Sequence, residues 1–188
     1  FNALSGIQNL MNKNEIDNAN KYLSKFARLT RNVLDDKELI SLSQEKNLLD
    51  DYLQMEQLRF GFKYEINCSE NLDLGNIEIP SMLLQPFVEN AILHGIVPKE
   101  GDGRIEVNFN VISNQLICTI TDDGIGLSKS KAIKENSVKA HQSMALEITK
   151  KRLEMMENST QQKAQVTMEE IYNIDNQIIG TKVIITLP

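Results

Sequence analysis

The first sixty residues contain no proline and a single glycine, Gly6, before Gly61. Proline and glycine are the residues that most often interrupt a helix, so residues 3–60 are predicted to be helical throughout. Apolar residues recur at helical spacing in three segments, which predict helices at about 4–11, 14–34 and 43–60. Asn14 and Ser43 are the expected N-caps, Gly61 is the expected end, and residues 35–37 are the expected turn between the last two helices.

The apolar period changes to two after Gly61, which is typical of half-buried strands. We expect strands at 62–66, 104–111, 116–120, 164–168 and 182–187, with turns at 113–114 and 173–176. A helix at about 82–96 is expected to open at Ile79–Pro80. Residues 128–142 are expected to form a loop, and another helix follows them. The pattern predicts an α+β fold, with a helical hairpin in residues 1–61 and a mixed α/β layer in residues 62–188.

Composition excludes several classes of protein. The 188 residues carry a net charge of −6, which argues against direct nucleic-acid binding. No apolar run is long enough for a membrane span. Cys68 and Cys118 are the only cysteines and lack motif spacing, so a reduced cytosolic compartment is expected and a disulfide or metal role is not. The chain begins with Phe1, which indicates a fragment of a longer protein.

The segment 84–95 combines an apolar stripe with polar residues on a different helical face. Asn90 and His94 are four residues apart and therefore share that face. An asparagine oxygen is a suitable hard ligand for Mg²⁺. The alternative is an ordinary amphipathic helix whose Asn90 and His94 point to solvent. The stripe consists of Leu84, Phe87, Val88, Ala91 and Ile92.

A second candidate segment, 121–127, directly follows an alternating strand. The carboxylate of Asp122 could accept a hydrogen bond from an exocyclic amine such as that of adenine, and Gly124 and Gly126 would let a flat ligand come close. The alternative is an acidic turn. Gly180 and Thr181 precede the last strand and could approach the same ligand, although a plain turn before an edge strand is the other interpretation.

The segment 128–142 is basic within an acidic protein, with four lysines against the single acid Glu135. Such a loop could attract polyphosphate, and the helix that Ser143 starts could hold phosphate oxygens with its free N–H groups. The alternative is a solvated loop. The lysines are Lys129, Lys131, Lys134 and Lys139.

In this order, the segments resemble the N, G1, G2 and G3 boxes of the GHKL ATPase superfamily, and among its members the LytS/YehU-type sensor histidine kinases. Residues 84–95 resemble the N box "LQPLVENAIxHG", and residues 122–126 resemble the G1 box with Asp123 in place of the usual Asn. Residues 180–183 resemble the G3 pattern "GTxV", and residues 52–60 resemble the phrase "YLxIExxRF". One departure is residues 143–146, which stand where the G2 box normally carries glycines.

The resemblance implies a Bergerat-type two-layer sandwich, in which a mixed, mostly antiparallel sheet has helices on one face. It implies ATP and Mg²⁺ as ligands. By resemblance, Asp122 would bind the adenine amine, Thr181 would lie beside the adenine, and Gly124 and Gly126 would shape the pocket. Further implied roles concern the phosphates and the reaction: Mg²⁺ coordination by Asn90, phosphate contacts by His94, Lys139 and Ser143, and a base or anchor for the acceptor at Glu89.

The start of the chain, residues 1–4, resembles the end of the phosphoacceptor motif "H-F-x-F-N-x-L", which places the accepting histidine three residues before Phe1. The implied partners are a response regulator, commonly of the LytTR DNA-binding type, and a second copy that completes a four-helix bundle. The implied location is the cytoplasmic side of an inner-membrane sensor. Three alternatives stay open: a monomer whose hairpin packs on its own α/β layer, a nucleotide-binding regulatory module without phosphotransfer, and a Ser/Thr kinase of the anti-sigma type.

Overall fold

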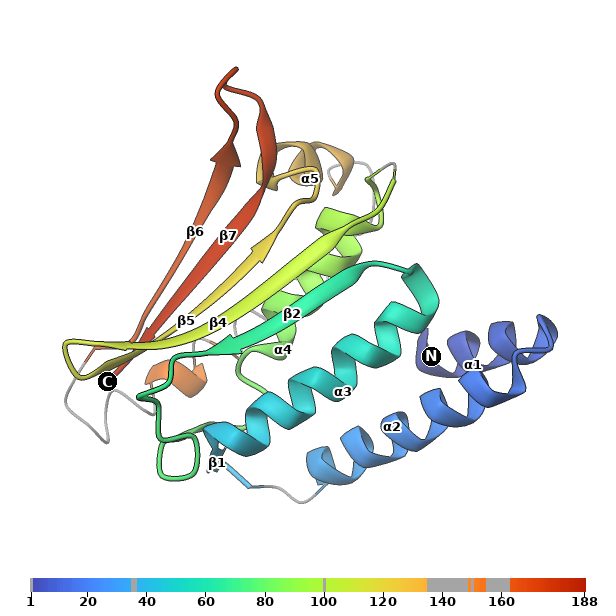
Figure 1. Ribbon diagram of the computed structural model, residues 1–188, viewed down its shortest axis with the longest axis horizontal. Helices are drawn as coiled ribbons and strands as arrows, with labels where there is room; N and C mark the ends of the chain where they lie inside the picture. Colours follow the sequence, from blue (N-terminus) through green and yellow to red (C-terminus); the bar gives the residue numbers. More distant parts are fainter. Residues whose placement is uncertain (1, 35–36, 100, 135–148, 150, 155–162) are drawn as a thin grey trace.

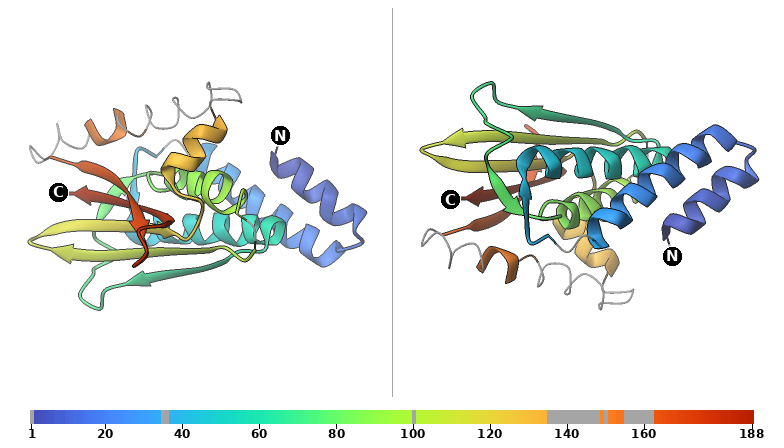
Figure 2. Two further views of the ribbon diagram at one scale, coloured as in Figure 1. Left: turned by 90° about the horizontal axis from the view of Figure 1, so that it is seen from above. Right: turned by 90° about the horizontal axis from the view of Figure 1, so that it is seen from below.

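The structure, a computed structural model, describes residues 2–34, 37–99, 101–134, 149, 151–154 and 163–188. Three helices come first: α1 (Asn2–Asn12), α2 (Ile16–Leu34) and α3 (Leu42–Phe60). Helix α3 runs beneath the sheet and α2 lies alongside α3, whereas α1 and the adjoining start of α2 project beyond one end of the sheet (Figures 1 and 2). The three predicted helices are confirmed, but the prediction of helix throughout residues 3–60 is wrong at β1 (Leu39–Ser41), a short strand between α2 and α3. The predicted turn at residues 35–37 lies mostly outside the described residues.

Two of the three predicted helix boundaries are corrected. Asn14 has a φ of 62°, a left-handed conformation that ends the turn after α1, so it does not cap α2. Ser41, not Ser43, caps α3: its hydroxyl accepts from the Gln44 N–H at 3.2 Å, and the Gln44 side chain accepts from the Ser41 N–H at 3.1 Å. Gly61 ends α3 as predicted, in a left-handed conformation with a φ of 73°.

The main sheet has five strands in the order β2-β4-β5-β7-β6. These are β2 (Lys63–Cys68), β4 (Arg104–Ile112), β5 (Gln115–Asp122), β6 (Gln165–Tyr172) and β7 (Ile178–Leu187). β2 pairs with β4 in parallel, and the other three pairs are antiparallel. The predicted mixed, mostly antiparallel sheet is therefore confirmed, and so is the hairpin turn at Ser113 and Asn114, both of which have positive φ.

The predicted helix at 82–96 begins later and ends in a different geometry. Residues 78–80 form β3 (Glu78–Pro80), which pairs antiparallel with β1 (Leu39–Ser41). α4 then runs only from Gln85 to Asn90 and continues as a π-helical segment, η1 (Ala91–Ile96). The prediction missed β3 because the three-residue strand is fixed by its partner β1, almost forty residues earlier in the chain.

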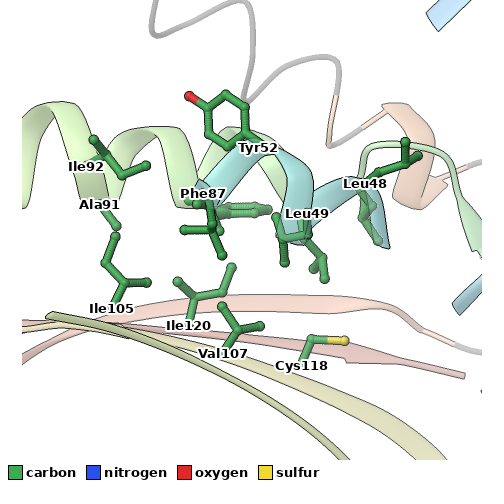
Figure 3. Packing of buried hydrophobic residues seen from close by; sticks show 14 of the residues in the cluster. Leu48, Leu49, Tyr52, Phe87, Ala91, Ile92, Ile105, Val107, Cys118 and Ile120 are labelled. Atoms are coloured by element: carbon green, nitrogen blue, oxygen red, sulfur yellow. The ribbon is translucent and has the colours of Figure 1, made fainter. Parts of the chain in front are cut away.

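One contiguous apolar core lies between the sheet and the helices. Figure 3 shows Phe87, Ala91 and Ile92 of the α4–η1 helix facing Ile105 and Ile120 of the sheet. All members of the predicted stripe at 84–92 are buried, which confirms their common face. Strands β4, β5 and β7 contribute alternate residues to this core, as the period of two predicts.

Helix α3 has two packed sides. Leu48, Leu49 and Leu53 are buried in the core. Figure 3 shows Leu48 and Leu49 on the side of α3 that faces the sheet. On its other side, the buried carboxylate of Asp51 accepts from Lys25 Nζ of α2 at 3.1 Å and also pairs with Arg28. The predicted domain boundary at residue 61 stays a prediction. Helix α3 precedes that boundary, but it shares one apolar core with the sheet that follows it.

Two further expectations about the second half are corrected. Residues 127–134 form helix α5 (Leu127–Lys134), where a loop was predicted from the scarcity of large apolar residues; residues 135–142 lie outside the described part. β7 begins at Ile178 and lies between β5 and β6, so Gly180 and Thr181 are inside a central strand and do not precede an edge strand. The helix expected after residue 143 is seen at Thr149 and residues 151–154.

Candidate functional site

Asp122 is the last residue of β5, and its side chain faces the core. The alternation of β5 places residues 116, 118 and 120 in the core, and Asp122 is the next residue in that row. Across the sheet, Asp122 is paired with Ile105 of β4 and Thr181 of β7, so all three side chains share one face. At this end of the sheet, two of the buried side chains that face the core are therefore polar: Asp122 on β5 and Thr181 on β7.

The loop after β5 packs directly against the turn of η1 at Gly95. The Ile125 N–H donates to the Gly95 carbonyl oxygen at 3.1 Å. A β-carbon on Gly124 would overlap the Gly95 backbone, and one on Gly95 would lie 2.7 Å from Asp122 Oδ1. The two glycines thus allow the helix and the carboxylate to meet, because any larger side chain would separate them.

Burial raises the pKa of the Asp122 carboxyl to about 6. The Gly124 N–H, which donates to Oδ1 at 2.9 Å, opposes this by stabilising the ionised form, whereas the neighbouring Asp123 charge adds to the increase. At neutral pH the group remains mostly ionised. It is a buried, oriented hydrogen-bond acceptor at the edge of the core, as recognition of an amine donor requires.

Asp123 holds the loop in place from its other side. Its Oδ1 accepts from the Arg104 N–H at 2.7 Å, and its Oδ2 pairs with Lys99 Nζ at 2.9 Å. An asparagine, the residue expected at this position by resemblance, could keep the first contact but not the charge pair. The substitution therefore fits a structural role at the start of β4.

The N-box residues divide between two faces of the α4–η1 helix. Asn90 and His94 are partly buried, and His94 adjoins Gly95, which contacts Asp122. Glu89 instead lines a cavity of about 360 Å³ between helices α1, α2, α3 and α4. The chain thus brings His94, Asp122 and Thr181 to adjoining elements, while Glu89 faces the helical layer. Roles for Asn90, His94 and Glu89 stay predictions.

The remaining candidates lie around the same loop or outside the described residues. Gly126 has a φ of 82°, and a β-carbon there would meet Ile178 of β7. Lys139 and Ser143, expected to contact phosphates, both lie outside the described residues.

Two residues near the start of α4 were missed by sequence reasoning. The carboxylate of Glu45, on α3, accepts from the N–H groups of Met82 at 2.8 Å and Leu84 at 3.0 Å. Arg152 donates to the carbonyl oxygens of Ser81 at 2.7 Å and Met82 at 3.3 Å. Both hold the turn from which α4 departs, whose Met82 has a φ of 56°. These contacts span 37 to 71 residues, and no local pattern signals them.

Among the described residues, no group of three or more His, Cys, Asp or Glu side chains could enclose a metal ion. Mg²⁺ commonly keeps several waters and binds through one or two protein oxygens plus substrate phosphates. A single amide oxygen, that of Asn90, fits this kind of site and not one in which the protein alone surrounds the ion.

Comparison with known proteins assigns the class. Residues 1–64 match the family model for histidine kinases. The chain is 36% identical over 129 residues to the sensor histidine kinase YpdA of Escherichia coli, covering 68% of this chain and 22% of that protein. It is 35% identical over 125 residues to the sensor protein LytS of Bacillus subtilis, covering 65% of this chain and 19% of that protein.

A solved structure agrees in fold. The histidine kinase domain of a blue-light-activated kinase from Erythrobacter litoralis superposes with a TM-score of 0.56 at 16% identity, covering 95% of this chain and 82% of that one. The fold is thus that of histidine kinase domains, which use ATP. More narrowly, the chain belongs to the LytS/YehU-type histidine kinases, and it spans about a fifth of the length of the two relatives described above.

Proposed function

We propose that this chain is the catalytic region of a two-component sensor kinase that binds ATP with Mg²⁺ and transfers the γ-phosphate to a histidine in the segment preceding α1. The phosphoryl group would then pass to an aspartate of a response regulator. The single observation that carries the proposal is the buried carboxylate of Asp122 at the core-facing end of β5, backed by Gly95 and flanked by Thr181.

Asp122 is suited to the recognition of adenine. Its carboxylate is fixed by the Gly124 N–H and stays mostly ionised at neutral pH, so it can accept a hydrogen bond from the exocyclic amine. Thr181 is its cross-strand neighbour and would lie beside the base. Gly124 and Gly126 would let the purine approach the backbone closely.

Asn90 would contribute an oxygen to Mg²⁺, and His94 would lie near the phosphates. When bound, the metal would neutralise charge on the β- and γ-phosphates, and positioning would supply most of the remaining acceleration. Lys139 and Ser143 belong to the segment that would close over the phosphates by resemblance. The bound nucleotide would thus extend from Asp122 along η1 toward α4.

Glu89 is proposed as the group that accepts a proton from the phosphoacceptor imidazole or anchors it. Burial raises its pKa, which favours proton acceptance. Its cavity is also lined by Ala3, so the first turn of α1 lies on the same side of the molecule as Glu89.

A homodimer is proposed for the full-length protein. Leu4, Met11, Ile16 and Leu23 of α1 and α2 are large apolar residues that stay about half exposed or more in the single chain. A second copy could cover them in a four-helix bundle. Light scattering on a concentration series tests this, and a monomer at every concentration would contradict it.

The cellular location and the type of response regulator are proposed from the resemblance to LytS/YehU-type kinases. Among the described residues, no helix is both long and apolar enough to cross a membrane. We propose that the chain forms the cytoplasmic part of an inner-membrane sensor and that its response regulator is of the LytTR DNA-binding type.

The test of the main proposal uses a longer protein that includes the residues upstream of Phe1. Incubation with γ-labelled ATP and Mg²⁺ is expected to give an acid-labile, base-stable phosphohistidine. Nucleotide binding without such a product would favour a regulatory module, and an acid-stable product would favour a Ser/Thr kinase.

Calorimetric titration together with circular dichroism distinguishes a loss of nucleotide binding from a loss of folding. Asn90→Ala is expected to abolish Mg²⁺-dependent ATP binding while the far-UV circular dichroism spectrum stays unchanged. The matched control is Asn110→Ala, an exposed residue on β4, which should bind ATP like the parent. Parental affinity in the Asn90 variant would refute the metal-ligand assignment.

A further inference from the structure

A buried polar network joins the first three helices away from the proposed nucleotide site. The Tyr22 hydroxyl of α2 donates to Glu56 Oε1 of α3 at 3.3 Å, and Arg59 donates to Glu56 Oε2 at 2.9 Å. Tyr22 is completely buried and Glu56 is 4% exposed. Glu56 and Arg59 are the charged residues that the phrase "YLxIExxRF" specifies, and the proposed contacts with ATP use neither of them.

Helix α1 packs directly onto this network at Gly6. A β-carbon at Gly6 would lie 2.9 Å from Arg59 Cδ and 3.0 Å from the Tyr22 hydroxyl oxygen, closer than real β-carbons normally approach. Any larger residue would push α1 away from α3 or displace Arg59, whose guanidinium also lies 4.5 Å from the Phe60 ring centre. Gly6 is thus the point at which α1 closely approaches the Arg59 side chain of α3 and the Tyr22 hydroxyl of α2.

The same network forms one wall of the cavity that Glu89 lines. Glu56 and Arg59 come from α3, Glu89 comes from α4, and Ala3 comes from the first turn of α1. Ala3 is three positions before Gly6 in α1, which is just under one helical turn. A shift of α1 at Gly6 therefore moves the start of α1 relative to Glu89 and to the helix that carries Asn90.

We propose that Gly6, Glu56 and Arg59 are positioning residues for phosphoryl transfer, which hold α1 against α3 at the spacing that brings the acceptor segment to α4. The inference rests on the proposed function. These residues act through α1 and touch no part of the proposed nucleotide site. Their loss should slow transfer without weakening ATP binding, because in-line transfer depends steeply on the distance between the reacting atoms.

The test is the initial rate of phosphohistidine formation by the full-length protein as a function of ATP concentration. For Gly6→Ala we expect kcat to fall at least about tenfold, while KM and the calorimetric Kd for ATP stay within about twofold of the parent. Gly75→Ala is the matched control, since its β-carbon would make only an ordinary contact with Asp73 at 3.6 Å; it should keep parental kcat.

Two milder variants decide the matter if Gly6→Ala does not fold. Glu56→Gln keeps an acceptor for Tyr22 but loses the charge pair with Arg59, and Arg59→Lys loses the planar guanidinium. Both should lower kcat at constant KM, and Arg59→Lys should retain more activity than Arg59→Ala. Parental kcat in all folded variants, or a parallel loss of ATP affinity, overturns the inference.

The inference and the proposed function fail in different ways. If the parent forms phosphohistidine and the variants form it equally fast, only the positioning role is wrong. If the parent binds ATP but forms no phosphohistidine, the proposed function fails and the positioning role fails with it.

Discussion

The buried carboxylate of Glu45 makes a distinctive dependence of stability on pH. Burial raises its pKa from 4.5 to about 7, although the N–H groups of Leu84 and Met82 oppose the shift. The folded state therefore favours the protonated form. This stabilising contribution is complete below pH 4.5, where the unfolded chain is also protonated, and it is lost as the pH rises through about 7.

The magnitude follows from the difference between the two pKa values. At about 1.4 kcal/mol for each unit, the group contributes roughly 3 kcal/mol less to stability at pH 8 than at pH 4.5. Glu45→Gln removes this titration. Glutamine has one acceptor oxygen for the two N–H groups of Met82 and Leu84, so the change also costs about 1 kcal/mol at every pH.

The two effects predict stability curves that cross. At pH 4 the Glu45→Gln variant should be less stable than the parent by about 1 kcal/mol, near pH 5 the two should be about equal, and at pH 8 the variant should be more stable by about 2 kcal/mol. Urea denaturation followed by far-UV circular dichroism measures this, since the chain has no tryptophan. Glu70→Gln, at an exposed position, should parallel the parent. Curves for Glu45→Gln that run parallel to the parent would refute the reasoning.

Three further predictions concern other sites. Because the pKa of Asp122 is raised to about 6, its acceptor is lost as the pH falls, so ATP affinity should drop about tenfold more between pH 7.5 and 5 in the parent than in Asp122→Asn; equal pH profiles by calorimetry would contradict this. Ser41→Ala should cost about 1 kcal/mol in urea denaturation and Ser43→Ala under about 0.5, and the reverse order would reinstate Ser43 as the cap. Asp51→Ala should cost roughly 2 kcal/mol, because it strands two cations on α2 that are themselves partly exposed; a loss under about 0.5 kcal/mol in the same assay would show that the pair is not stabilising.

Local patterns accounted for the parts of the fold that neighbouring residues determine. The period of two located the central strands, and Gly61 located the end of α3. The same period, extended by one step beyond Ile120, places Asp122 on the core-facing side, which is where the structure has it. The buried position of this candidate was thus readable from the sequence.

The errors arose where a local signal was ambiguous or a distant partner decided. Two serines stand near the start of α3, and the glutamine three residues after Ser41 was the signal that distinguishes them. β3 depends on pairing with β1, and the beginning of α4 depends on Glu45 and Arg152. Such contacts join residues far apart in the chain, so neither propensity nor periodicity reveals them.

The double-sided packing of α3 has a practical consequence for anyone dividing this protein into fragments. A fragment that starts at residue 62 keeps all five strands of the main sheet but lacks Leu48, Leu49 and Leu53 of α3. Apolar side chains on the helix-covered face of the sheet would then be exposed to water. It also removes the carboxylate that tethers the beginning of α4. A sensible cut falls ahead of β1, so that the shared helix stays with the sheet it covers.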